Sequence, residues 1–260
     1  GVATLDTADA NFHPYHLAPE HYHKDAAYHN GAVWPWLNGV AMQRMLERGQ
    51  VEPAWQLFAH TNAIAATRGV VGGLPENLDA YPRPGTTEPR LTGTYLQAWS
   101  NAEQLRTWYQ GFLGVQPELD RGVVRVAPRL PAELGAVKFV TRVGQGALHA
   151  RYDSMQHGRQ YSWRSAGQPL TLELDIAPFE VRTFPLSAGE SLVVTQRRDR
   201  LEARRVASDG TVGAAIGIPR STKRAEQQAA LDAILRGTRF ARPGDPDAHP
   251  VMRPDGVPPP

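Results

Sequence analysis

The chain has 260 residues, of which 41% are apolar and 21% charged, a composition that suits one large globular domain or two smaller ones. Its 28 basic and 26 acidic residues leave a net charge of only +2, which excludes the clustered basic surface of a nucleic-acid-binding protein. It has no cysteine and no apolar run of membrane-spanning length, so disulfides, thiolate zinc sites and membrane insertion are excluded and a cytoplasmic location is expected.

The pattern of residues 1–115 predicts helices joined by long loops. The first helix is expected to begin at Pro35, because proline is tolerated in a first helical turn, and to end before Gly49. Its apolar stripe consists of Leu37, Val40, Ala41 and Met45. A second helix is expected between Pro53 and Gly69, with Leu57, Phe58, Ile64 and Ala65 directed inward.

A third helix is predicted to begin near Thr92 or Thr94, because Thr94 and Gln97 have the spacing of a capping box. The side chains that we expect it to bury are Leu96, Trp99, Leu105, Trp108 or Tyr109, and Phe112. The segment from Gly69 to Thr92 is too long for a simple connection, so it is predicted to be an ordered functional loop.

From Gly122 onward the pattern changes to short strands with period two. They are Val123–Val126, Val137–Val140, Ala147–Tyr152, Leu170–Leu174 and Val181–Phe184, and Gly, Pro and Asp separate them. Residues 116–194 are therefore predicted to form an antiparallel sheet or sandwich. Residues 195–260 are charged and then Pro-rich, which predicts a largely disordered tail with one helix around Ala225–Leu235.

The segment with the most specific chemistry is Gly72–Ala80, a glycine-containing loop that carries Glu76. It lies between two aromatic segments, Tyr28–Trp36 upstream and Gly93–Ser100 downstream. Sugar rings present apolar faces that stack on aromatic side chains, which bury large apolar area while keeping a polar edge. A carboxylate beside such side chains can activate water for glycoside hydrolysis, so the three segments together favour a sugar-binding cleft.

Together, the three segments resemble the C-terminal amylo-α-1,6-glucosidase region of glycogen debranching enzymes. Further matches in Phe112–Glu118 and Ala127–Pro131 extend the resemblance over about residues 10–190. The resemblance implies that residues 1–115 are the C-terminal helices of an (α/α)6 toroid and that 116–194 are a small antiparallel β domain. The expected fold class is thus mainly α, with a disordered tail at 195–260.

The resemblance also implies inverting hydrolysis of α-1,6-glucosidic branch points in glycogen-type limit dextrins. Glu76 aligns with the family's general base, whereas the general acid belongs to an earlier segment that has no counterpart here. We therefore expect a C-terminal fragment of a glycoside hydrolase, cut at Gly1 from a longer polypeptide, inactive alone, with the upstream part of the same catalytic domain as its partner. No cofactor is implied, because carboxyl groups make both proton transfers.

Each candidate residue also has a purely structural interpretation. In that interpretation Glu76 is an ordinary loop carboxylate. Asp79, the competing candidate for the base, then accepts backbone N–H bonds. The tryptophans of the three segments either stack on sugar or pack in the core. The predicted substrate-binding residues are Tyr28, His29, Asn30, Trp34, Trp36, Asp79, Gln97 and Trp99.

The spacing of the N-terminal histidines matches no zinc signature, so no metal site is expected at His13, His16, His21, His23 and His29. Two other functions stay open. The chain is alternatively part of a toroid α-glucosidase for a small glucoside such as trehalose or glucosylglycerate, or a non-catalytic carbohydrate-binding module. In each case the expected ligand is an α-glucan or oligosaccharide, with no nucleic acid and no membrane.

Overall fold

The computed structural model describes residues 1–16 and 26–237, and their side chains up to Ile234. The chain forms two compact units, each of which is described by itself. The helical unit comprises residues 1–107 and the described residues from Ala233 onward. The β unit comprises Trp108–Asp232.

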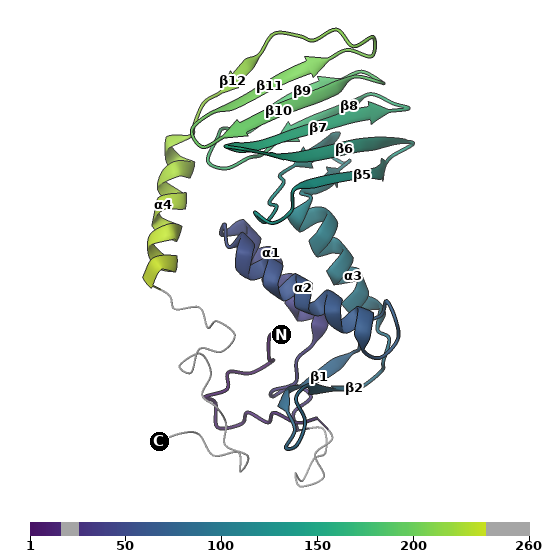
Figure 1. Ribbon diagram of the computed structural model, residues 1–260, viewed down its shortest axis with the longest axis vertical. Helices are drawn as coiled ribbons and strands as arrows, with labels where there is room; N and C mark the ends of the chain where they lie inside the picture. Colours follow the sequence, from purple (N-terminus) through teal and green to yellow (C-terminus); the bar gives the residue numbers. More distant parts are fainter. Residues whose placement is uncertain (17–25, 238–260) are drawn as a thin grey trace. The chain divides into compact units, whose positions relative to one another are not determined.

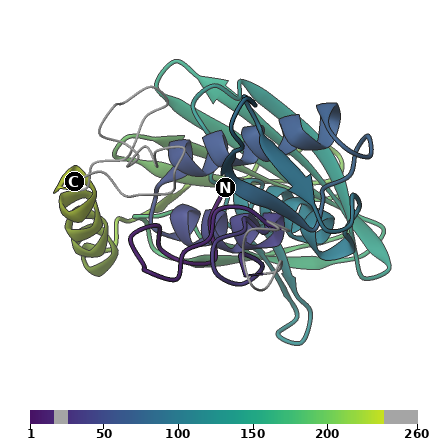
Figure 2. The ribbon, with the colours of Figure 1, turned by 90° about the horizontal axis from the view of Figure 1, so that it is seen from below.

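The helical unit is built on α1 (Pro35–Glu47), α2 (Val51–Thr67) and α3 (Ala98–Arg106), together with the strands β1 (Asn77–Pro82) and β2 (Pro89–Thr92). Helix α1 packs against both α2 and α3 (Figures 1 and 2). Its start at Pro35 is confirmed, and it ends before Gly49, whose φ of 74° suits a glycine after a helix. The antiparallel pair β1–β2 occupies the segment that was predicted to be a functional loop.

The contact between α1 and α3 depends on Gly39. A Cβ atom at this position would lie 2.7 Å from the Cβ of Glu103, closer than side-chain carbons approach one another. The hydroxyl of Thr107 also donates to the carbonyl of Gly39, at 3.3 Å. The predicted apolar stripe of α1 is therefore wrong, because the buried residues are Pro35, Asn38, Gly39, Met42 and Leu46.

Helix α3 begins later than predicted and buries polar side chains. Gln97 is its N-cap and accepts the N–H of Ala98, so the predicted capping box does not form. Its buried residues are Ser100 and Gln104. The predicted buried side chains Leu96, Trp99 and Leu105 are instead 54%, 49% and 58% exposed.

The β unit contains two sheets that share one core. The strand order is β12-β11-β10-β7-β6-β5 in the larger sheet and β3-β4-β8-β9 in the smaller one. Buried side chains of both sheets, such as Trp163 and Leu172, belong to a single apolar cluster, so the two sheets form a sandwich. A π-helix, η1 (Thr107–Phe112), precedes the strands. The strands are β3 (Val115–Glu118), β4 (Val123–Val126), β5 (Ala136–Val143), β6 (Gly146–Met155), β7 (Gly158–Ala166), β8 (Leu170–Leu174), β9 (Arg182–Leu186), β10 (Ser191–Arg197), β11 (Leu201–Val206) and β12 (Ile216–Ile218).

The predicted fold class is wrong. The described residues contain four α-helices and twelve strands in three sheets, so the chain is not mainly α and its helices do not make up a toroid. The smaller sheet is also not purely antiparallel, because β4 pairs with β8 in parallel.

The predicted disordered tail is wrong over part of its length. Strands β11 and β12 and helix α4 (Thr222–Gly237) all lie after residue 195. In β11 the buried residues Leu201 and Ala203 alternate with Glu202 and Arg204, so the strand period is present in a highly charged sequence. The Pro-rich end of the predicted tail, residues 238–260, lies outside the described residues.

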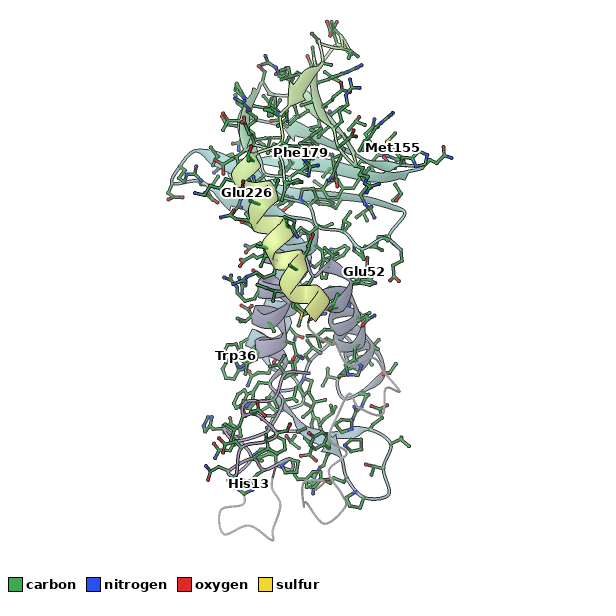
Figure 3. All side chains as sticks on the ribbon, turned by 90° about the vertical axis from the view of Figure 1, so that its left-hand side faces the viewer. His13, Trp36, Glu52, Met155, Phe179 and Glu226 are labelled. Carbon is green, nitrogen blue, oxygen red and sulfur yellow. The ribbon has the colours of Figure 1, made fainter. Side chains whose placement is uncertain are left out.

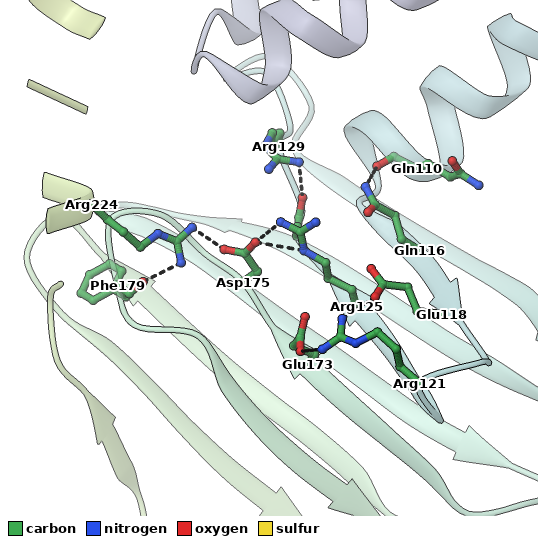
Figure 4. Close-up of polar contacts among 11 residues, drawn as sticks. Gln110, Gln116, Glu118, Arg121, Arg125, Arg129, Glu173, Asp175, Phe179 and Arg224 are labelled. Carbon is green, nitrogen blue, oxygen red and sulfur yellow. Dashed lines mark hydrogen bonds and ion pairs between the residues drawn. The ribbon is translucent and has the colours of Figure 1, made fainter. Parts of the chain in front are cut away.

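An ionic cluster within the β unit joins the first turn of α4 to the smaller sheet (Figure 4). The carboxylate of Asp175, of which 5% is exposed, is paired with the guanidinium groups of Arg125 and Arg224. Arg224 also donates to the carbonyl of Phe179, at 2.9 Å. Burial alone would raise the pKa of Asp175, but hydrogen bonds from the two arginines outweigh burial and hold that pKa below its ordinary value.

Candidate functional site

Three segments that are far apart in the sequence meet at the loop before β1. Val33, in the first aromatic segment, exchanges two backbone hydrogen bonds with Leu78, at 2.8 and 2.9 Å. The N–H of Glu76 donates to the carbonyl of Thr94, at 2.8 Å, which joins the loop to the second aromatic segment. The register of β1–β2, which pairs Asn77 with Thr92, extends this junction.

The start of α3 fixes the same loop from the other side. The N–H of Gln97 donates to the carbonyl of Leu74, at 2.8 Å, and the hydroxyl of Ser100 donates to the carbonyl of Pro75, at 2.9 Å. The side-chain oxygen of Asn101 accepts the N–H of Leu74, at 2.9 Å. Because Leu74 is itself buried, the backbone immediately before Glu76 has little freedom to move.

The Glu76 carboxylate is half-buried and held at both oxygens. Tyr28 donates its hydroxyl to Oε1 at 2.6 Å, and the backbone N–H of Thr94 donates to Oε2 at 3.1 Å. Gly93 makes this approach feasible. Its φ is +67°, and a Cβ atom there would lie 2.4 Å from Oε2 of Glu76.

Tyr28 is positioned by Trp34. The indole packs edge-on against the tyrosine ring, with centroids 4.6 Å apart, and its Nε1 donates to the carbonyl of Tyr28 at 2.9 Å. Trp34 is 9% exposed, and His29 stacks on it with an angle of 10° between the ring planes. Trp34 therefore supports the tyrosine that holds Glu76, while the exposed His29 ring extends the aromatic group toward solvent.

Asp79 lies two residues after Asn77 and has no exposed surface. It accepts the backbone N–H of His16 at 2.8 Å and forms an ion pair with Arg83 at 2.7 Å. Arg83 in turn donates to the carbonyl of His16, at 2.6 Å. This closed set of contacts ties the N-terminal segment to β1 and places Asp79 behind the loop surface.

The other predicted site residues occupy separate positions on the helical unit. Asn30 is exposed, Trp36 is half-buried in the first turn of α1 (Figure 3), and Trp99 is about half exposed in the first turn of α3. The side chain of Gln97 caps α3 and its Nε2 lies 3.4 Å from the hydroxyl of Thr94, beside the residue that binds Glu76.

Sequence reasoning did not assign the residues that hold the loop. Ser100 and Asn101 act through side-chain contacts to the backbone, and Thr94 acts through its N–H. Ser and Asn in a first helical turn commonly bond to nearby backbone, which is the signal that could have identified them. Arg83, the partner of Asp79, had no sequence signal because its ion pair forms within β1 and the following turn.

Among the described residues, no group of three or more His, Asp and Glu side chains is arranged to hold a metal ion. His21 and His23, two of the histidines at which no metal site is expected, lie outside the described residues. Within the described part of the chain, no helix combines the length and apolar character that a membrane crossing requires.

The arrangement can accept a proton. A carboxylate oxygen has two lone-pair sites, so each oxygen of Glu76 can accept a hydrogen bond from water in addition to the bond from Tyr28 or Thr94. A water molecule on the exposed side of the carboxylate would lie beside a fixed base. This is the local geometry that an inverting glycoside hydrolase needs on one side of its substrate.

The family model for amylo-alpha-1,6-glucosidase matches residues 1–106, the stretch that contains all three segments. Residues 1–106 are thus similar to the amylo-alpha-1,6-glucosidase family. The resemblance to the C-terminal region of glycogen debranching enzymes is confirmed, and the amylo-alpha-1,6-glucosidase region is related to glycoside hydrolases. No curated protein and no solved structure gave a significant match to the chain.

Proposed function

We propose that the amylo-alpha-1,6-glucosidase region of this chain takes part in hydrolysing α-1,6-glucosidic branch points of glycogen-type limit dextrins. The observation that carries the proposal is the half-buried carboxylate of Glu76, fixed by Tyr28 and by the N–H of Thr94 in a region of this family. In this role Glu76 is the general base.

The proposed reaction inverts the configuration of the anomeric carbon. Glu76 removes a proton from a water molecule, whose oxygen attacks that carbon while a general acid protonates the departing glycosidic oxygen. The acid is supplied by an upstream part of the same catalytic domain. Inverting enzymes place the two carboxyl groups roughly 6.5–9.5 Å apart, which leaves space for the water.

The sugar subsite is proposed to lie on the exposed side of Glu76. His29, Asn30, Trp36 and Trp99 are at least partly exposed and supply aromatic and planar polar contacts. Three other predicted residues act mainly as supports. Tyr28 binds the carboxylate and is positioned by Trp34, and Gln97 caps the start of α3. Asp79 holds the loop, because its oxygens are buried and engaged by His16 and Arg83.

The decisive variant is Glu76→Gln in the protein that carries this chain together with the upstream part. Because a glutamine cannot take the proton from water, turnover on a limit dextrin is expected to fall by at least about three orders of magnitude. The change keeps the shape of the side chain, so the circular dichroism spectrum should be unchanged. The matched control is Glu47→Gln, which removes an exposed carboxylate that pairs with Arg44.

Retention of more than about a tenth of wild-type turnover by the Glu76→Gln protein would remove Glu76 from the role of base.

Inversion is checked by proton NMR of the first product, which should be β-glucose. A substrate panel with limit dextrin, trehalose and glucosylglycerate separates branch-point hydrolysis from action on a small glucoside. Binding of maltodextrin without hydrolysis of any of them would favour a carbohydrate-binding module. The proposal includes a cytoplasmic location, which cell fractionation tests.

A further inference from the structure

Two buried side chains next to Glu76 have polar atoms without a hydrogen-bond partner in the described part of the chain. Asn77 has no exposed surface, and neither its Oδ1 nor its Nδ2 is bonded. Thr92 is 4% exposed, and its hydroxyl is likewise unbonded. Buried polar atoms are nearly always satisfied by protein or by ordered water, so these three atoms require an explanation.

The two side chains belong to one place in the fold. Asn77 and Thr92 are direct partners in the β1–β2 register, and residues paired in this way bring their side chains close together on one face. Glu76 precedes Asn77 in the chain, and Gly93 follows Thr92. The unsatisfied atoms therefore lie at the same junction that fixes the candidate base.

The geometry around Gly93 brings the amide and the carboxylate toward one point. The position that a Cβ of Gly93 would occupy is 2.7 Å from Oδ1 of Asn77 and 2.4 Å from Oε2 of Glu76. The absence of a side chain at Gly93 lets both oxygens approach that point, which places them close to each other. A molecule that satisfies Asn77 and Thr92 has only a short distance to reach the carboxylate.

We propose that Asn77 and Thr92 bind one enclosed water molecule that hydrogen-bonds to Glu76. The amide Nδ2 of Asn77 donates to the water oxygen, and the water donates to Oε2 of Glu76 and to Oδ1 of Asn77 or the hydroxyl of Thr92. Three such bonds are typical of a buried water. The water is not the nucleophile, because Asn77 has no exposed surface from which a sugar could be reached. Asn77 and Thr92 are thus positioning residues for Glu76.

The proposal rests on the proposed function only in calling Glu76 the base; the water site itself is independent of catalysis. Its first test is therefore a measurement of stability on the chain as given. Asn77→Leu and Thr92→Val remove the polar atoms at nearly constant shape, and Thr92→Ser keeps the hydroxyl while removing a methyl group. The urea midpoint is measured for the single variants and for the two double variants that pair Asn77→Leu with each Thr92 change.

If a shared water is bound, Asn77→Leu and Thr92→Val each lower the urea midpoint, and together they lower it by clearly less than the sum of their separate shifts. If the atoms are truly unsatisfied, replacing them by apolar groups leaves the midpoint unchanged or raises it, and the effects add. That second result would overturn the proposal. Thr92→Ser is the control: because it keeps the hydroxyl and hence the water, its shift and that of Asn77→Leu should add, whereas coupling as large as with Thr92→Val would show that only packing was measured and would overturn the proposal.

Crystallography of the unmodified chain tests the proposal even if a variant does not fold. A crystal structure of the unmodified chain should contain a water within about 3.2 Å of Asn77 Nδ2 and Glu76 Oε2. An empty, well-ordered site would refute the proposal whatever the role of Glu76. With the upstream part present, Thr92→Val should lower kcat at unchanged KM, because it moves the carboxylate and not a sugar contact. If Glu76 is not the base, this effect on kcat will be absent, whereas the water and the coupling in stability will still be observed.

Discussion

Gly93 helps to set the position of the candidate base although it has no side chain of its own. Its φ of +67° is a conformation that residues with a Cβ adopt at a cost, and its missing side chain leaves the space that Oε2 of Glu76 occupies. The N–H of the next residue, Thr94, then reaches that oxygen. A single glycine thus serves both the turn and the carboxylate.

Gly93→Ala is therefore expected to displace the carboxylate as well as strain the backbone. We expect a loss of about 1–2 kcal/mol in the free energy of unfolding from the left-handed conformation, and a loss of turnover of at least about tenfold in the protein with its upstream part. The measurements are urea unfolding and initial rates on limit dextrin.

Gly85→Ala is the matched control for Gly93→Ala. Gly85 has a φ of +79°, but a Cβ there would meet no atom within 4 Å. It should show the same backbone cost with turnover close to that of the unmodified protein. Equal turnover in the two alanine variants would mean that Gly93 acts through the turn alone.

At the level of residues, the sequence motifs pointed to Glu76 and Tyr28 but not to several residues that hold the loop. Glu76 and Tyr28 were named from the motifs, and the structure joins them by a hydrogen bond of 2.6 Å. Trp34 was predicted to bind sugar, with core packing as the alternative, and its side chain is 9% exposed. The contribution of Ser100 could not be read from spacing, because it depends on a loop carbonyl that only the folded chain brings near.

Among the elements, the ionic cluster at Asp175 carries the clearest consequence for stability. Asp175 is buried directly after β8 of the smaller sheet, while Arg125 comes from β4 and Arg224 from α4. Removing the charge of a buried partner leaves the guanidinium groups without compensation. The contact therefore links α4 to the sheet through one carboxylate.

Asp175→Asn is expected to lower the free energy of unfolding by about 2–3 kcal/mol at pH 7, less than for a fully buried pair because both arginines can hydrate. The pKa of Asp175 is held below its ordinary value in the folded protein. Its contribution is thus present above the unfolded-state pKa of about 3.9 and is lost as the pH falls through the lower folded-state value. The difference between the two proteins should shrink below about pH 4.

Urea unfolding at pH 7 and at pH 3 measures this difference. Asp153→Asn is the control, since Asp153 is more exposed and pairs with the exposed Arg151, and it should cost less than about 1 kcal/mol. A difference between Asp175→Asn and the unmodified chain that stayed constant from pH 7 to pH 3 would contradict the account.

The elements show where sequence patterns are sufficient. Strands β4 and β8 were predicted with their observed bounds, because their apolar residues alternate without interruption. Helix α3 was placed too early and its buried side was misjudged. The prediction assumed that tryptophan and leucine would be buried, whereas Ser100 and Gln104 are buried because they bond to backbone carbonyls of the loop and of α2.

For the whole molecule, the prediction of a mainly α fold failed because it was taken from the family resemblance. The amylo-alpha-1,6-glucosidase match ends at residue 106, and the described chain beyond it is dominated by strands. The strand β11 escaped notice because its solvent-facing residues are charged. A resemblance that covers only the first part of a chain does not predict the secondary structure of the remaining residues.

The two compact units differ in how much apolar surface each encloses. The β unit has one large core that spans both sheets, whereas the buried apolar side chains of the helical unit include a separate small cluster of Val33, Ile64, Leu74 and Leu78 beside the candidate site, and also Met42, Leu46 and Phe58. Trp99 and Leu105 on α3 are about half exposed, so only part of their apolar area contributes to stability. Units with separate cores are expected to unfold separately.

We therefore expect two transitions in urea, with the helical unit unfolding first. Circular dichroism at 222 nm should lose most of its signal in the lower transition. The fluorescence of Trp163, which is fully buried in the β unit, should change only in the upper one, so that Trp163→Phe reduces the amplitude there. Asp175→Asn should move the upper transition alone. A single transition in which both probes coincide, or an equal shift of both by Asp175→Asn, would mean that the units fold as one cooperative body.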